Sequence, residues 1–140
     1  MPAAPAPPNP PQVPPAGTGL TPPTGAPGIP GATRLTAAEQ ETASRLLKAR
    51  PDLKLTESVH EGAEYVDQSG RTYDALGSPA ASKFWNPKQF LSSIDAHLLK
   101  SNDFTVVDLT GFASDQIAVV RNYINNLPSV SQLKIIRIGF

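Results

Sequence analysis

The stretch from residue 63 to residue 76 reads AEYVDQSGRTYDAL, in which two short runs that favour β-strand flank a turn. Asp67 and Gly70 occupy the first and fourth positions of a type I turn, which predicts a three-residue hairpin loop ending in a left-handed glycine. This loop sets a register in which Glu64 faces Asp74, so two carboxylates share one face of the hairpin. A two-residue loop would instead place the two acids on opposite faces.

Helix and strand signals on either side of the hairpin define one small domain. The predicted elements, in chain order, are a helix that begins after Thr36 and ends before Pro51, strands at 53–56, 63–67 and 71–76, a helix at 87–98, a strand at 104–109, a helix from Ser114 to residue 127, and a strand at 133–138. Short connections within the final strand, helix and strand require a right-handed parallel crossover. We therefore expect an α/β (α+β) fold with a mixed sheet and the order αβββαβαβ, in which an antiparallel meander joins a parallel pair.

The N-terminal part of the chain differs in composition from the rest. Residues 1–31 contain 12 of the 16 prolines and 5 of the 10 glycines, and every charged residue lies at or after Arg34. Such a segment has too little apolar surface to fold alone. The sequence therefore predicts a disordered Pro/Gly-rich linker over residues 1–33 and a folded domain over residues 34–140. The linker is expected to act as a spacer, because a ligand for proline-binding domains would need a flanking basic residue.

Composition excludes several classes of protein. Twelve basic and twelve acidic residues give a formal net charge of zero, which argues against a protein that coats nucleic acid with positive charge. The absence of cysteine removes disulfides, thiolate nucleophiles and the common structural zinc sites. No apolar run approaches the ~20 residues that span a bilayer, so we expect no membrane span, and the first residues lack the features of a classical signal peptide.

Acidic residues concentrate around the hairpin. Residues 57–74 hold five acids, at positions 57, 61, 64, 67 and 74, against Arg71 as the one basic residue. Facing carboxylates are unfavourable unless a metal ion or a shared proton neutralises them, which makes Glu64 and Asp74 a candidate site. A solvated acidic hairpin explains the same charge. Glu39 adds a third acid, because helical spacing turns it toward the core, but it is also the capping-box partner of the helix N-cap.

Four segments of the chain resemble a known family. They read EQETASRLLKARPDLKLTES, GAEYVDQSGRTYDALG, FWN and FTVVDLTGF, and the resemblance covers residues 34–140. This combination is similar to the C-terminal tRNA-nuclease domains of contact-dependent growth-inhibition and related polymorphic bacterial toxins, a branch of the PD-(D/E)xK nuclease fold. The resemblance implies a toxin effector domain that cleaves tRNA or another RNA with Mg²⁺ or another divalent cation. It leaves open whether tRNA, other RNA or DNA is cut.

In that family, acids from a helix, the second strand and the third strand bind the cation that activates water at a phosphodiester. The matching positions here are Glu39, or Glu41 by an alternative alignment, then Glu64 and Asp74. The lysine that the family places two residues after the third-strand acid is Leu76 here. Lys83 is therefore the candidate for the missing positive charge, with a solvated loop lysine as the alternative.

Other residues are candidates for chemistry or binding. His60, beside the acidic hairpin, is a candidate acid or base, whereas His97 on the second helix is expected to be structural. Phe84 and Trp85 are candidates for stacking on a base, although an aromatic pair just before a helix also serves as core. Basic residues outnumber acidic ones six to four from Lys83 onward, which favours attraction of a phosphate backbone.

A toxin domain also implies a partner and a place of action. Its producer needs a cognate immunity protein, and we expect an acidic one that covers parts of Lys83, Lys88 and Lys100 and competes with nucleic acid. The alternative is an inhibitor that docks on the acidic hairpin. The proline-rich linker suits a secreted toxin that is delivered into a target cell and acts in its cytoplasm.

Two other functions fit the sequence. The first is a non-catalytic binding module at the end of a proline-rich secreted protein, whose hairpin acids contact a basic partner. Leu76 favours this module, because it stands where the nuclease family has a lysine. An acid on the inner face of the first helix favours the nuclease, because a surface patch that binds a partner does not need an acid there. The second is a metal-independent nuclease that uses His60 and Lys83.

Overall fold

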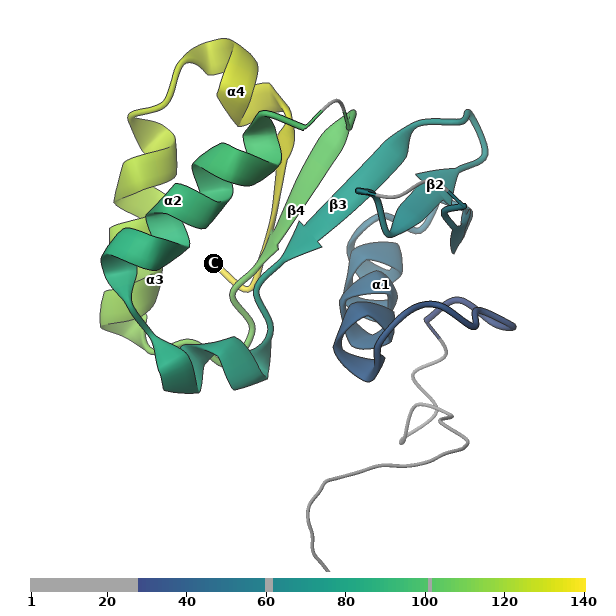
Figure 1. Ribbon diagram of the computed structural model, residues 1–140, viewed down its shortest axis with the longest axis horizontal. Helices are drawn as coiled ribbons and strands as arrows, with labels where there is room; N and C mark the ends of the chain where they lie inside the picture. Colours follow the sequence, from purple (N-terminus) through teal and green to yellow (C-terminus); the bar gives the residue numbers. More distant parts are fainter. Residues whose placement is uncertain (1–27, 60–61, 101) are drawn as a thin grey trace, which may run out of the picture.

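The computed structural model describes residues 28–59, 62–100 and 102–140. Its elements are, in chain order, α1 (Ala37–Ala49), β1 (Leu55–Glu57), β2 (Tyr65–Asp67), β3 (Thr72–Leu76), η2 (Pro79–Phe84), α2 (Pro87–Leu98), β4 (Phe104–Asp108), α3 (Ser114–Asn125), α4 (Ser129–Leu133) and β5 (Ile135–Ile138). The strands form one sheet in the spatial order β1-β2-β3-β4-β5. One apolar core lies between the sheet and α1, and another between the sheet and α2 and α3, so the molecule has three layers (Figure 1).

The sheet is mixed, as predicted. β1, β2 and β3 are antiparallel neighbours, whereas β3, β4 and β5 run parallel to one another. The parallel part has three strands rather than the predicted pair, because the connection through η2 and α2 is a second crossover. Four of the five residues of β4 are buried, in agreement with the apolar run that predicted a strand covered on both faces.

Two short helical segments distinguish the observed order from the predicted one. The order αβββαβαβ is recovered only when η2 and α4 are left aside. Leu133, predicted to begin the last strand, instead ends α4, because Pro128 cannot continue α3 and starts a new turn. Ser114, where the third helix was expected to start, is the first residue of α3, and Ala113 is its N-cap. Within the described residues, no helix has the length and apolar character needed to cross a membrane.

The capping box of α1 forms as predicted. Oγ1 of Thr36 accepts a hydrogen bond from the N–H of Glu39 at 3.1 Å, and Oε1 of Glu39 accepts one from the N–H of Thr36 at 2.9 Å. The helix stops shortly before Pro51. Its inner side buries three residues, Thr42, Ala43 and Leu46.

The packed part of the chain begins before Arg34. Ile29 is buried in the core on the α1 side of the sheet, and the side chain of Gln40 binds its N–H (2.6 Å) and its carbonyl oxygen (3.0 Å). Glu57 accepts hydrogen bonds from two backbone N–H groups of the same segment. The boundary expected at Arg34 therefore falls inside the packed part, and residues 1–27 of the expected linker lie outside the described residues.

The hairpin between β2 and β3 has the predicted three-residue loop. Gly70 has a φ of +84°, and its N–H donates to the carbonyl oxygen of Asp67. Tyr65 pairs with Tyr73, which is the register of the three-residue loop and excludes that of the two-residue loop.

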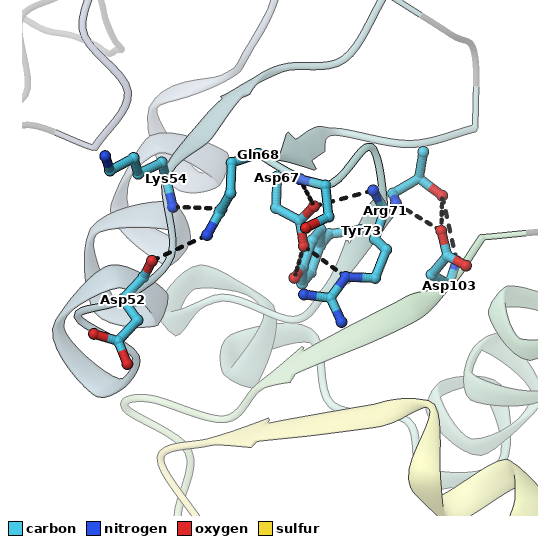
Figure 2. Close-up of polar contacts among 9 residues, drawn as sticks. Asp52, Lys54, Asp67, Gln68, Arg71, Tyr73 and Asp103 are labelled. Atoms are coloured by element: carbon cyan, nitrogen blue, oxygen red, sulfur yellow. Dashed lines mark hydrogen bonds and ion pairs between the residues drawn. The ribbon is translucent and has the colours of Figure 1, made fainter.

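A polar network around Asp67 holds this hairpin together (Figure 2). The buried Asp67 carboxylate accepts hydrogen bonds from the hydroxyl of Tyr73 (2.8 Å) and from Nε of Arg71 (3.0 Å). Burial alone would raise the pKa of Asp67, but these donors, the backbone N–H groups of the turn and the Arg71 charge hold it below its ordinary value. Asp67 is therefore a structural residue of the turn, as its position in the loop predicted.

Candidate active site

Glu64 departs from the hairpin register that would place it opposite Asp74. Its N–H donates to the carbonyl oxygen of Tyr73 at 2.9 Å, although Tyr65 is already the ladder partner of Tyr73. Two residues opposite one are typical of a β-bulge, which bends a strand and re-aims a side chain. Glu64 and Tyr65 both stand opposite Tyr73, so Glu64 is not the ladder partner of Asp74 that the loop predicted.

The bulge carries the Glu64 side chain to the edge of β3, beyond the end of β2. Oε1 of Glu64 accepts a hydrogen bond from the N–H of Ala75 at 2.5 Å, a backbone donor that a longer β2 would have satisfied. The Glu64 carboxyl group also shares a hydrogen bond with the carboxyl group of Asp74. The two predicted acids are thus in direct contact, although they are not ladder partners.

The surroundings of Glu64 favour a proton between the two acids. Burial and the hydrogen bond with Asp74 raise the pKa of Glu64 to about 8, with further contributions from the charges of Asp74 and Glu39 and an opposing effect of the Ala75 N–H. Glu64 is therefore mostly protonated at neutral pH and donates a hydrogen bond to the Asp74 carboxylate. A shared proton was one of the two ways in which facing carboxylates were expected to be neutralised.

Two basic side chains, one from the last turn of α2 and one from two residues beyond it, lie over Asp74, which is 1% exposed. Nζ of Lys100 lies 2.9 Å from Oδ2 of Asp74, and Nε2 of His97 lies 3.6 Å from the same oxygen. Nδ1 of His97 donates to the carbonyl oxygen of Ser93 at 2.7 Å, which leaves Nε2 to face Asp74. The Glu64 and Asp74 carboxyl groups, the Lys100 ammonium and the His97 ring form what we call the acid–lysine cluster.

The topology explains why these residues meet. Side chains alternate along β3, so Asp74 lies on the same side of the sheet as Leu76, which packs in the core beneath α2 and α3. Asp74 is also the ladder partner of Thr105, near the start of β4. Because α2 runs back over the sheet before β4 begins, the residues at its C-terminal end reach Asp74.

Lys100 is absent from the site residues predicted from the sequence, and His97 was expected to be structural. Lys100 provides beside Asp74 the positive charge that Leu76 does not provide. The sequence could have indicated this contact. A right-handed crossover places the helix that leads into β4 over the preceding strand, β3. A histidine and a lysine three residues apart at the end of that helix are then candidates for contact with the β3 acid.

The other predicted residues that the structure describes do not join the cluster. The Glu39 carboxylate is engaged in the α1 capping box, and its charge reaches Glu64 only as a minor contribution to the raised pKa. Glu41 is half-buried on α1, Lys83 is exposed at the end of η2, and His60 lies outside the described residues. The part of the chain that the structure describes holds no group of three or more His, Asp or Glu side chains arranged to bind a metal ion. The three-acid cation site therefore stays a prediction.

The described hairpin acids do not form a solvated patch. Asp67 and Asp74 are buried, and Glu57 is bound to the N-terminal segment. Glu61 lies outside the described residues. Local interactions thus occupy most of the charge that the sequence offered to a basic partner.

Two hollows give access to this region from the α1 side of the sheet. One, of about 230 Å³, is lined by Glu64, Glu39 and Glu57, and a second, of about 180 Å³, is lined by Glu39, Thr42 and Ala75. Because Glu39 lines both, the two hollows are neighbours. The hollow at Glu64 therefore lies beside the first turn of α1.

A second buried acid has a structural role. Asp108, at the end of β4, accepts a hydrogen bond from Oγ1 of Thr42 (2.7 Å) and forms an ion pair with Nη2 of Arg45 (2.9 Å). These contacts attach α1 to the sheet. Asp108 is 0% exposed, so it is not available to a substrate.

The fold belongs to a class of small α+β domains in which a mixed sheet lies between one helix and a pair of helices. One solved structure of similar fold is a CdiA-CT toxin from Burkholderia pseudomallei E479 in complex with its cognate CdiI immunity protein. The similarity covers 73% of this chain and 98% of the toxin chain, with a TM-score of 0.60 and 22% sequence identity. At this identity, the similarity shows a common fold. No protein-family model and no curated protein sequence matches the chain.

Proposed function

We propose that this chain is a toxin effector domain that hydrolyses phosphodiester bonds in RNA, with tRNA as the expected substrate, after delivery into the cytoplasm of a target cell. The observation that carries the proposal is the contact of half-buried Glu64 with buried Asp74, whose carboxylate also meets Lys100 and His97. Groups of this kind bind a phosphate and move protons around it. The similarity in fold to a CdiA-CT toxin supports the toxin class, and that toxin's complex with CdiI supports an immunity protein as partner.

The chemistry of the acid pair suits a divalent cation. Mg²⁺ prefers oxygen ligands and usually binds through one or two carboxylates together with substrate phosphates, so Glu64 and Asp74 would hold it. The shared proton marks the position where a positive charge is needed. When bound, the cation supplies a water of lowered pKa as nucleophile. Glu39 does not fit as a third ligand, because its Oε1 accepts the Thr36 N–H.

The chain's own residues then have separate roles. The Lys100 ammonium, whose side chain is 41% exposed, holds the substrate phosphate and offsets its developing charge. Nε2 of His97 accepts or gives a proton, because Nδ1 is fixed on the Ser93 carbonyl oxygen. Oε1 of Glu64 accepts the Ala75 N–H, so Oε2 is the Glu64 oxygen that would be left for a cation.

Incubation of the purified chain with total tRNA, ribosomal RNA and DNA, in Mg²⁺ or in EDTA, tests this proposal. We expect tRNA to be cut at a defined position in Mg²⁺, with the activity lost in EDTA and in Asp74→Ala. If no nucleic acid is cut under any of these conditions while the chain is folded, the nuclease is excluded and the non-catalytic binding module takes its place.

One observation favours a second mechanism, a metal-independent nuclease. His97 and Lys100 already supply a proton-transfer group and a positive charge beside Asp74. The sequence suggested His60 and Lys83 for these tasks; Lys83 is exposed at the end of η2, and His60 lies outside the described residues. Equal cleavage in EDTA and in Mg²⁺, together with loss of activity in His97→Ala, would identify this mechanism.

A further inference from the structure

A hollow of about 300 Å³ lies between η2 and the first turns of α2. Its lining combines aromatic rings with polar side chains, namely Phe84, Trp85, Asn86, Gln89, Phe90 and Ser93. Among the described residues, no acidic side chain lines it. The mixture of flat apolar surface and hydrogen-bonding groups is typical of a site for a flat polar ligand.

Two of the rings differ in how firmly they are held. The Trp85 ring packs with its centroid 5.6 Å from that of Phe90 and 6.1 Å from that of Phe112, so its position is fixed. The Phe84 side chain, at the end of η2, is 83% exposed. A fixed ring and an exposed ring therefore line the same hollow, an arrangement that suits stacking on a nucleobase.

Amides and cations complete the surroundings. Oδ1 of Asn86 caps α2 by accepting the Gln89 N–H at 3.1 Å, which leaves the Asn86 NH₂ group as a donor. The Gln89 side chain is exposed and makes no hydrogen bond with the described part of the chain. Lys83 and Lys88 are exposed beside the hollow, and neither forms an ion pair within the described ranges. Amides suit the edge of a base, and lysines suit the neighbouring phosphates.

The hollow lies on the side of α2 that leads to the acid–lysine cluster. Gln89, Ser93 and His97 follow one another at four-residue spacing, so they fall within about 80° on the helix surface. The separation of eight positions between Gln89 and His97 corresponds to about 12 Å along the axis. A nucleic-acid strand with one phosphate at Lys100 can therefore run along this side of α2 and place a base in the hollow.

We propose that this hollow binds an unpaired nucleobase of the substrate, stacked on Trp85 and Phe84, a short distance from the cleaved phosphate. The inference rests on the proposed nuclease function and names what the site selects. A base reaches the hollow only when it is unstacked from its own strand, which favours loops and single-stranded segments over duplex.

Trp85 is the only tryptophan, so its fluorescence reports binding directly. The test uses the full chain with Asp74→Ala, so that the probe is not cut. The probes are a single-stranded hexaribonucleotide, its deoxy counterpart and an abasic hexamer of the same charge. We expect saturable quenching by the first probe and binding about tenfold weaker for the abasic hexamer, because stacking contributes roughly tenfold or more per base.

Phe84→Ala in the same background provides the second arm. It should weaken hexamer binding about tenfold, whereas Leu133→Ala, which removes another exposed apolar side chain (79% exposed) from α4, should leave binding unchanged. Comparison of the ribo- and deoxyribo-hexamers shows whether the 2′-hydroxyl contributes. Thermal unfolding of both variants confirms that each is folded.

The outcomes separate this inference from the nuclease proposal. If the wild-type chain cuts RNA but abasic and ordinary hexamers bind equally well, the base site is wrong and the nuclease stands. If the hexamer binds through Phe84 but no nucleic acid is cut, the base site stands and the nuclease falls. If Phe84→Ala weakens binding of an immunity protein and leaves hexamer binding unchanged, the hollow is a protein-docking site and the inference is overturned.

Discussion

Nζ of Lys100 lies 2.9 Å from Oδ2 of Asp74, although the two residues stand 26 positions apart in the chain. Lys100 comes from the end of α2 and Asp74 from the middle of β3, so their contact exists only in the folded protein. Asp74 is buried, and its carboxyl group also contacts that of Glu64. One carboxylate thus joins the two halves of the acid–lysine cluster.

Lys100→Gln should lower the rate of RNA cleavage by about 100-fold or more, because a positioned cation that offsets developing phosphate charge has an effect of this size. The Lys100 side chain is 41% exposed, so the melting temperature should change little. Lys48→Gln, which removes an exposed lysine from the last turn of α1, is the matched control. A Lys100→Gln variant that cleaves as fast as the Lys48→Gln variant would remove Lys100 from the mechanism.

Asp74→Asn should abolish cleavage and lower the pKa of Glu64 from about 8, because the negative charge that opposes ionisation of Glu64 is gone. Carboxyl ¹³C NMR of the metal-free chain measures this pKa directly.

In Asp74→Ala the free energy of unfolding should rise or stay level, since one of two adjacent acids is deleted and Lys100 returns to solvent. A loss of ~2 kcal/mol or more in urea unfolding would identify Asp74 as a structural acceptor instead.

The pH dependence of stability should reveal Asp67. Its pKa is lower in the folded chain than in the unfolded chain, so its contribution is present above its unfolded pKa of 3.8 and is lost as the pH falls through the folded pKa. Asp67→Asn should therefore destabilise the chain by about 2 kcal/mol at pH 7, with a difference that shrinks below pH 3.8. Thermal unfolding from pH 2 to pH 7 measures it, with the exposed Asp52→Asn as control. A difference independent of pH would rule out an ionised Asp67 as the cause.

Gly77→Ala should destabilise the fold more than Gly70→Ala. Both glycines have positive φ, +93° and +84°, which costs an L-residue about 1–2 kcal/mol. At Gly77 a Cβ would also lie 2.3 Å from the carbonyl oxygen of Asp108, whereas at Gly70 it would meet open space. We expect a loss of about 1–2 kcal/mol at Gly70 and at least ~3 kcal/mol at Gly77. Equal losses in urea unfolding would contradict the close approach of β3 and β4.

Local chemistry made part of the structure predictable. The turn residues Asp67 and Gly70 define the hairpin loop and its register, and Thr36 with Glu39 defines the start of α1, because each signal lies within a few residues. The bulge at Glu64 is not encoded in this way. It accompanies packing of Tyr65, whose hydroxyl donates to the Glu39 carbonyl oxygen on another element.

The candidate site was predictable to the same extent. The hairpin loop brings Glu64 near Asp74, but the bulge sets their contact. Burial is the largest cause of the raised pKa of Glu64, and the hydrogen bond and charge of Asp74 add to it. Lys100 and His97 depend on how α2 crosses the sheet, which residue spacing alone does not give. For Glu39 the sequence offered both a local capping role and a role in the site, and the carboxylate takes the capping role.

The basic residues beside the base-binding hollow should also steer the immunity protein. Lys83→Glu with Lys88→Glu should slow association with the cognate immunity protein at low salt, because both lysines are exposed and the expected inhibitor is acidic. Lys48→Glu with Lys54→Glu changes the net charge equally on exposed residues elsewhere and should have a much smaller effect. Stopped-flow association rates are measured at rising salt. If the Lys83 and Lys88 patch steers the inhibitor, reversal of these two charges should remove most of the salt dependence, and reversal of Lys48 and Lys54 should not. If association at low salt is unchanged by the Lys83 and Lys88 reversals, the inhibitor does not approach this face, and docking on the hairpin beside Glu64 takes its place.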